Sequence, residues 1–309
     1  MNINSETRVY IAGCGGMLGK SVYETFRKVA QVRATDIDVN EPWLSYADVR
    51  DYSDISKSIL EFRPHAIINL AALTDMEYCE ENWENAWQTN ALGAENIGLI
   101  ANMLDVPYLY ISTAGIFGGE KECFSDFDAP NPLSYYAKSK YAGELFVREH
   151  INKYYVVRAG WMMGGGPGKD KKFVNKIYKQ LESGATELNV VDDKLGTPTY
   201  TVDFARGLLK LFESDLYGVY NQVCEGSCSR YDVAVEFVRL LGLGQTVKIN
   251  RVSSDFFKQE YFAPRPPSEK LLNIKLKARG LYVMRNWKIC LDEYSQVFAQ
   301  DLQEKDLNK

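Results

Sequence analysis

Three glycines near the start of the chain constrain its fold more than any other feature. Gly13, Gly16 and Gly19 follow a short apolar run at residues 8–12 and precede a segment with helical periodicity that extends to Lys28. A phosphate at the N-terminus of a helix needs free backbone N–H groups and close approach of the backbone, which side chains would block. The pattern therefore predicts a strand, a tight turn and a helix that hold the pyrophosphate of a dinucleotide. A tight turn without a ligand is the alternative interpretation.

The first half of the chain continues this alternation of strand and helix. Apolar runs predict strands at residues 31–36, 65–72, 107–112 and 154–158, and helical patterns lie between them at residues 51–62, 80–104 and 134–150. Strands that are apolar on both faces and alternate with helices form parallel sheets covered on both sides. We therefore expect an α/β fold, with a doubly wound parallel Rossmann sheet over residues 1–160. A smaller C-terminal α/β substrate domain is expected over residues 161–309, with segments near 193–225 returning to the first domain.

Composition excludes several classes of function. The chain has 309 residues, 46% hydrophobic and 25% charged, as is typical of a globular protein. Its net charge of −5 provides no basic surface for a nucleic acid. Because the chain has only two histidines, His65 and His150, we expect no metal centre.

The cysteines and the hydropathy indicate where the protein works. Six cysteines are scattered without a CxxC pair, which favours reduced thiols in the cytosol. The N-terminus lacks the pattern of a signal peptide, and no run of about 18 apolar residues occurs. We therefore expect a cytoplasmic protein that does not bind a membrane.

Asp36 lies at the end of the second predicted strand, beyond the glycine-rich turn. A carboxylate at this place accepts hydrogen bonds from the adenosine ribose of a dinucleotide. It also repels a 2′-phosphate, because both groups are negatively charged. NAD(H) is therefore the favoured cofactor and NADP(H) the alternative, and an ordinary turn aspartate is the other interpretation of this residue.

Tyr136 and Lys140 are four residues apart in a predicted helix, so they share one face of it. The preceding strand ends at Ser112 and Thr113, which places a hydroxyl opposite this pair. A tyrosine can donate a proton to a carbonyl oxygen that a threonine hydroxyl polarises. We expect the lysine ammonium to lower the pKa of the tyrosine from its usual value of about 10. The three residues predict a site for carbonyl reduction, whereas the Tyr–Lys pair alone is consistent with a contact on a helix surface.

Longer stretches of the chain carry a family resemblance. They include ADVRD at Asp48, IINLAALTD from Ile67, TNALGAENI at Asn90, DDKLGTPTY from Asp192 and GVYNQVCEGSCSRYD from Gly218. Together with the glycine turn and the Tyr–Lys pair, they resemble the extended short-chain dehydrogenases/reductases that act on nucleotide sugars. Within that family they are most similar to the dTDP-4-dehydrorhamnose reductases.

The resemblance implies roles for individual residues. The cofactor-binding positions it implies follow the predicted strands: Gly13, Gly16, Met17, Leu18 and Gly19 at the pyrophosphate, Asp36 at the adenosine ribose, Asp48 and Val49 at the adenine, and Ala72, Leu73 and Thr74 at the nicotinamide half. Thr113, Tyr136 and Lys140 would be the catalytic residues, with Tyr136 and Lys140 also contacting the cofactor. The substrate-binding residues it implies are Thr113, Ala114, Tyr136 and Trp161.

The chain departs from the family pattern at several positions. Ala114 and Gly115 stand where the family has aspartate and tyrosine, and Glu269 stands where it has serine. Lys171 and Lys172 replace two asparagines. Because Ala114 and Gly115 are expected to face the sugar, the identity of the hexose stays open.

These observations favour NAD(P)H-dependent reduction of a nucleoside-diphosphate 4-keto-6-deoxyhexose. The alternatives are a nucleotide-sugar epimerase or dehydratase with bound NAD, and a non-catalytic NAD(P)-binding regulatory subunit. Ala114 argues against the dehydratase, because that position lacks the acid/base carboxylate. The intact Thr113, Tyr136 and Lys140 argue against the regulatory subunit. The sequence leaves open whether the protein forms a homodimer.

Overall fold

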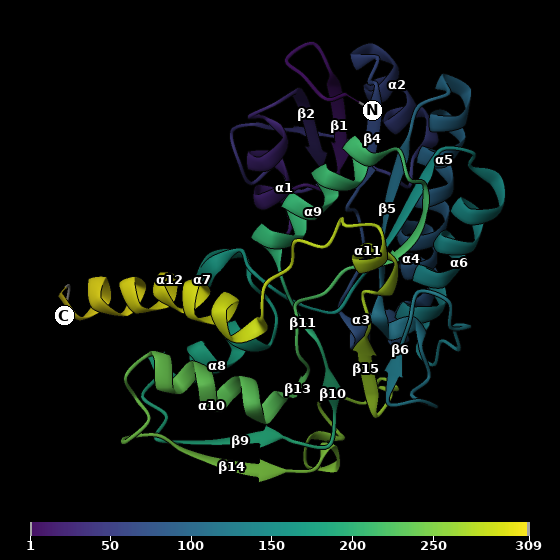
Figure 1. The fold of residues 1–309 in the computed structure, drawn as a ribbon. Helices are drawn as coiled ribbons and strands as arrows, with labels where there is room; N and C mark the ends of the chain where they lie inside the picture. Colours follow the sequence, from purple (N-terminus) through teal and green to yellow (C-terminus); the bar gives the residue numbers. More distant parts are fainter. Residues whose placement is uncertain (1, 308–309) are drawn as a thin grey trace.

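The computed structural model in Figure 1 describes residues 2–307. Its main feature is a seven-stranded sheet in the order β12-β7-β5-β4-β1-β2-β3. The strands are β1 (Arg8–Ala12), β2 (Gln31–Asp36), β3 (Leu44–Tyr46), β4 (Ala66–Asn69), β5 (Tyr108–Thr113), β7 (Tyr154–Ala159) and β12 (Gly218–Asn221). Every neighbouring pair is parallel, which confirms the expected doubly wound α/β fold.

Alternate residues of β1 point into two separate hydrophobic layers. Val9 and Ile11 belong to the layer on one face of the sheet, and Tyr10 and Ala12 to the layer on the other. Successive side chains of a strand point to opposite faces, so a strand apolar throughout needs cover on both. Helices α1 (Gly19–Phe26) and α9 (Thr201–Ser214) cover the first face, and α2 (Tyr52–Phe62), α5 (Gly93–Leu104) and α6 (Tyr135–His150) cover the second (Figure 1).

The structure divides the single helix expected over residues 80–104. It contains α3 (Met76–Glu81), α4 (Trp83–Trp87), a π-helical turn over Gln88–Leu92 and then α5. The break between α3 and α4 falls at Asn82, whose backbone is not helical and whose side chain donates to the carbonyl of Tyr78. An asparagine side chain competes in this way with the backbone bonds of a helix.

Three smaller sheets accompany the large one, and all of their strands except β6 follow β7 in the chain. They are β13 (Cys228–Ser229), β10 (Leu195–Gly196), β15 (Ser268–Leu271) and β6 (Cys123–Phe124) in that order, β8 (Trp161–Met163) with β11 (Pro198–Tyr200), and β9 (Glu187–Val191) with β14 (Lys248–Val252). The accompanying helices are α7 (Gly166–Lys169), α8 (Phe173–Glu182), α10 (Arg230–Leu240), α11 (Ile274–Ala278) and α12 (Trp287–Leu307). The same part of the chain supplies α9 and β12 to the large sheet. Over residues 2–307, no helix combines the length and the apolar character needed to cross a bilayer.

A buried ion pair joins helix α6 to the sheet. Arg158 on β7 donates to the carboxylate of Glu144 on α6, with Nη2 2.5 Å from Oε1 and Nε 3.1 Å from Oε2. Ser112 on β5 donates its hydroxyl to the same carboxylate at 2.7 Å. The side chains of Glu144 and Arg158 are 0% and 2% exposed, so each charge depends on the other for compensation. The pair therefore fixes α6 against β5 and β7.

Replacement of Glu144 should destabilise the fold strongly. Glu144→Gln keeps the size of the side chain but leaves the Arg158 guanidinium buried without its counter-charge. We expect a loss of about 3–5 kcal/mol in the free energy of unfolding, measured by urea denaturation. Glu149→Gln, at an exposed position of the same helix, is the matched control and should change stability by less than about 0.5 kcal/mol. Equal effects of the two substitutions would contradict this account.

Candidate active site

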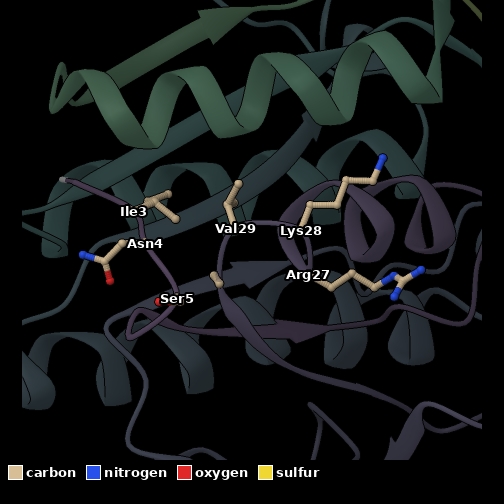
Figure 2. A pocket seen from close by; sticks show the side chains of 7 residues that line it. Ile3, Asn4, Ser5, Arg27, Lys28 and Val29 are labelled. Carbon is tan, nitrogen blue, oxygen red and sulfur yellow. The ribbon is translucent and has the colours of Figure 1, made fainter.

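The predicted site residues gather at the carboxyl edge of the large sheet. The glycine-rich turn follows β1, Asp36 ends β2, Asp48 follows β3 and Thr113 ends β5. In an open parallel sheet the ligand-binding crevice lies outside this edge. The hollow in Figure 2, lined by residues 3–5 and 27–30, lies instead beside the amino ends of β1 and β2 and does not belong to this group.

The three glycines of the turn have different surroundings. A Cβ at Gly13, which has a φ of +75°, would lie 2.1 Å from the backbone nitrogen of Ala71. A Cβ at Gly19 would lie 1.7 Å from the carbonyl oxygen of Cys14. At Gly16, in contrast, no atom lies within 4 Å of the Cβ position. Gly13 and Gly19 are therefore required by packing, whereas Gly16 leaves open space before the N-terminus of α1.

Asp36 lies directly beside this turn. Its Oδ2 accepts a hydrogen bond from the backbone N–H of Gly15 at 2.8 Å, and its Oδ1 accepts one from Asp38 at 2.9 Å. Asp48 instead forms an ion pair with Arg50, with 2.6 Å between Nη2 and Oδ2, and this pairing lowers the pKa of the Asp48 carboxyl. The carboxylate of Asp36 thus lies at the turn, while that of Asp48 is held by a neighbour.

Asn90 holds the loop that follows β4, a role that the sequence did not single out. Its Oδ1 accepts from the backbone N–H of Leu73 at 2.9 Å, and its Nδ2 donates to the Leu73 carbonyl at 3.0 Å. Lys172 fixes the next residue, because its Nζ donates to the carbonyl and the hydroxyl of Thr74. An asparagine inside a helical pattern is unfavourable for the helix, and this was the available signal.

The structure brings Thr113, Tyr136 and Lys140 together. Ser134 caps α6 by accepting a hydrogen bond from Ala137, so Tyr136 lies in the first turn and Lys140 one turn later. The hydroxyl of Thr113 lies close enough to that of Tyr136 to lower its pKa. Thr113 Oγ1 also accepts from the N–H of Gly115 at 3.1 Å, which orients the threonine side chain at the end of β5.

The pKa values of Tyr136 and Lys140 differ from those expected from the sequence. Burial raises the pKa of Tyr136 to about 12, and the nearby hydroxyl of Thr113 offsets part of that rise. Burial also lowers the pKa of Lys140 to about 7, although the negative charge of Glu144 opposes this shift. The Lys140 ammonium lies 4.1 Å from the centroid of the Tyr110 ring. The expected lowering of the tyrosine pKa is therefore wrong for this structure, because desolvation of the phenolate dominates and Lys140 is not among the groups that shift this pKa.

Trp161 and Ala114 lie in environments that the sequence did not predict. The indole Nε1 of Trp161 donates to Glu269 Oε2 at 2.7 Å, and the guanidinium of Arg230 lies 3.7 Å from the ring centroid. Ala114, expected to face the sugar, is 2% exposed and packs in an apolar cluster that includes Phe117. Glu269 and Arg230 were not predicted as site residues, although the departure of Glu269 from the family pattern was a signal.

The fold and the arrangement of Thr113, Tyr136 and Lys140 at its carboxyl edge define a Rossmann protein of the extended short-chain dehydrogenase/reductase class. Within that class, the chain belongs to the family described as the RmlD substrate binding domain, which matches residues 7–300.

Individual relatives agree with this assignment. The spore coat polysaccharide biosynthesis protein SpsK of Bacillus subtilis is 30% identical over 291 residues, covering 94% of this chain and 97% of that protein. The crystal structure of a dTDP-4-dehydrorhamnose reductase from Clostridium acetobutylicum is 35% identical, with a TM-score of 0.84, over 94% of this chain and 99% of that chain. The enzyme of the same name from Bacillus anthracis, solved in complex with NADP, is 30% identical, with a TM-score of 0.85, over 94% of this chain and 98% of that chain.

The low pKa of Lys140 predicts a pH-dependent gain in stability when the lysine is removed. In the unfolded chain its pKa is about 10.4. The buried ammonium therefore costs stability fully below pH 7, and this cost disappears as the pH rises towards 10.4. Without added dinucleotide, we expect Lys140→Met to raise the free energy of unfolding by a few kcal/mol at pH 6 and by clearly less at pH 9.5.

Thermal melts at the two pH values measure this difference. Lys138→Met, at an exposed position on the same helix, is the control and should give nearly the same Tm as the unmodified protein at both. A loss of stability in Lys140→Met that does not depend on pH would show that the lysine is not strained by burial.

Proposed function

We propose that the protein reduces the 4-keto group of a nucleoside-diphosphate 4-keto-6-deoxyhexose with NADH or NADPH. The proximity of the side chains of Thr113 and Tyr136, with Lys140 one helical turn further along α6, is the observation that carries this proposal. The relatives named dTDP-4-dehydrorhamnose reductase support the substrate class, since they match nearly the whole chain.

The chain's own residues account for binding of the dinucleotide. Open space at Gly16 and the uncapped N–H groups of α1 suit a pyrophosphate. We expect Asp36, whose carboxylate lies beside the turn, to accept hydrogen bonds from the adenosine ribose and so to favour NAD(H) over NADP(H). A bound reduced nicotinamide supplies a hydride to the carbonyl carbon of the substrate.

Tyr136 completes the reduction by delivering the proton. With its pKa raised to about 12, the phenol is protonated at neutral pH and begins the reaction as an acid. Thr113 lies beside the tyrosine hydroxyl and polarises the same carbonyl oxygen. The carbonyl carbon gains the hydride and its oxygen gains the phenolic proton, so the product is an alcohol. Thr113 stabilises the phenolate that forms, because its hydroxyl lowers the pKa of Tyr136.

The cysteines bear on the cellular location of the enzyme, and its exposed aromatic residues bear on its oligomeric state. We propose a cytoplasmic location, which the free state of all six cysteines supports. We also propose a homodimer, because Trp83 and Trp87 on α4 and Tyr135 on α6 are exposed aromatic residues of the kind that a second copy would cover. Size-exclusion chromatography with light scattering tests this assembly.

Oxidation of NADH and NADPH against a panel of nucleoside-diphosphate 4-keto-6-deoxyhexoses tests the activity, with the product stereochemistry determined by NMR. We expect Tyr136→Phe to lower kcat by about 100-fold or more, because it removes the proton donor and keeps the ring. Its Kd for the dinucleotide should stay within about twofold of wild type. The neighbouring Tyr135→Phe is the matched control and should retain full activity. Failure of the wild type on every substrate, or near-normal turnover by Tyr136→Phe, would refute the proposal.

The glycine turn allows a separate test of the cofactor site. Gly16→Ala should fold normally, because its Cβ meets no atom, yet raise the Kd of the dinucleotide by about tenfold or more. Gly19→Ala should instead lower Tm, since its Cβ would overlap the Cys14 carbonyl. Gly244→Ala, in an exposed loop, controls for the added methyl group. A Gly16→Ala protein that binds dinucleotide as tightly as wild type would remove the turn from the site.

A further inference from the structure

Glu269 reaches the catalytic group from a distant part of the chain. It lies on β15, where its register partner on the parallel strand β10 is Gly196. A Cβ at Gly196 would lie 2.2 Å from Cε2 of Trp161, so only glycine leaves room for the indole against this strand. The indole is thereby held beside Glu269, whose Oε2 accepts its N–H at 2.7 Å.

Arg230 holds the same indole from α10. Its guanidinium lies 3.7 Å from the ring centroid, within the range of a strong cation–π contact. Arg230 forms no ion pair within 4 Å among the residues that the structure describes, but the charge of Glu269 acts on it and opposes the lowering of its pKa by burial. The stacked guanidinium and the Gly196 backbone restrict how the indole can turn, and the indole in turn fixes one oxygen of Glu269.

The other carboxylate oxygen of Glu269 points towards the catalytic residues. Oε1 lies 3.3 Å from the position that a Cβ would take at Gly115. The same position lies 3.4 Å from Thr113 Oγ1 and 3.7 Å from Tyr136 Cε1. A methyl-sized space is therefore bounded by a carboxylate oxygen, a hydroxyl and the ring of the catalytic tyrosine. The glycine at 115 keeps this space open.

Within the part of the chain that the structure describes, Oε1 of Glu269 receives no hydrogen bond. Among residues 2–307, Glu269 receives one side-chain hydrogen bond, that of Trp161 to Oε2. Its charge nevertheless acts on the site, because it contributes to the raised pKa of Tyr136, although less than burial does. An ionised oxygen in a partly buried position is stabilised when a donor occupies the space before it.

We propose that Glu269 is a specificity-determining residue that accepts a hydrogen bond from a hydroxyl or ammonium group on the sugar carbon next to the reacting carbonyl. This inference rests on the proposed function. In a 4-keto-6-deoxyhexose, C5 carries a methyl group and the ring oxygen, so C3 is the neighbour of C4 that can carry a donor. A site built to receive a donor rejects an analogue that lacks it, because its own polar group is then left unpaired.

Substrates that differ only at C3 test the role of Glu269. We expect the wild type to favour a 3-hydroxy or 3-amino substrate over its 3-deoxy counterpart by at least about tenfold in kcat/KM. Glu269→Ala should reduce this preference to within about threefold, through a loss on the donor-bearing substrate alone. Glu269→Gln keeps an acceptor for Trp161 and removes the charge. The preference of Glu269→Gln for the 3-hydroxy substrate over the 3-deoxy substrate should therefore fall less than its preference for the 3-amino substrate. This difference shows which of the two donors Glu269 binds.

Glu122→Gln is the matched control. Glu122 is an exposed carboxylate that forms an ion pair with Lys270, the residue after Glu269 on β15. This control should leave the preference unchanged. Equal losses of kcat/KM on the 3-hydroxy and 3-deoxy substrates in Glu269→Ala would show that Glu269 only supports Trp161, and an unchanged preference would also overturn the inference.

Calorimetric binding of the same sugar nucleotides with oxidised dinucleotide measures the preference without turnover. Absence of turnover would then refute the proposed reduction, while the binding preference and its loss in Glu269→Ala would still decide the role of Glu269.

Discussion

The candidate site depends on the buried ion pair between Glu144 and Arg158. Helix α6 carries Tyr136 and Lys140, and β5 carries Thr113, so the three residues meet only if helix and strand keep one relative position. Glu144 binds Ser112, the residue before Thr113, and Arg158 on the adjacent strand. Such a pair adds little net stability over apolar packing, but it accepts very little displacement of its partners. Its value here is the alignment of the catalytic helix with the strand end.

A second constraint comes from parts of the chain that are distant in sequence. Two residues beyond β7 reach the carboxyl edge of the large sheet. Lys172 donates a hydrogen bond to Thr74 in the loop after β4, and Glu269 lies near Thr113. The first half supplies the glycine turn and the group of Thr113, Tyr136 and Lys140. The second half supplies Lys172 and Glu269, polar residues that differ from the family pattern.

The sequence predicted the fold well where the apolar pattern was long and regular. The strands β1, β2, β4, β5 and β7 are confirmed, whereas β3 was missed because it has three residues, two of them exposed, at the edge of the sheet. The helix expected over residues 80–104 was wrong because its apolar spacing continues across the break at Asn82 and the π-helical turn that follows. The roles of individual cofactor and substrate residues remain predictions.

The sequence by itself determined the doubly wound sheet, the glycine turn and the grouping of Thr113, Tyr136 and Lys140. Each of these follows from local rules: a strand period of two, a helix period of 3.6, and strands whose carboxyl ends meet at one edge. Only the tertiary structure decided the charges of the group and its polar neighbours. The pKa of Tyr136 depends on how completely the fold excludes water, and Glu269 reaches Trp161 across 108 residues of chain. Neither desolvation nor contact at that separation leaves a periodic signal in a sequence.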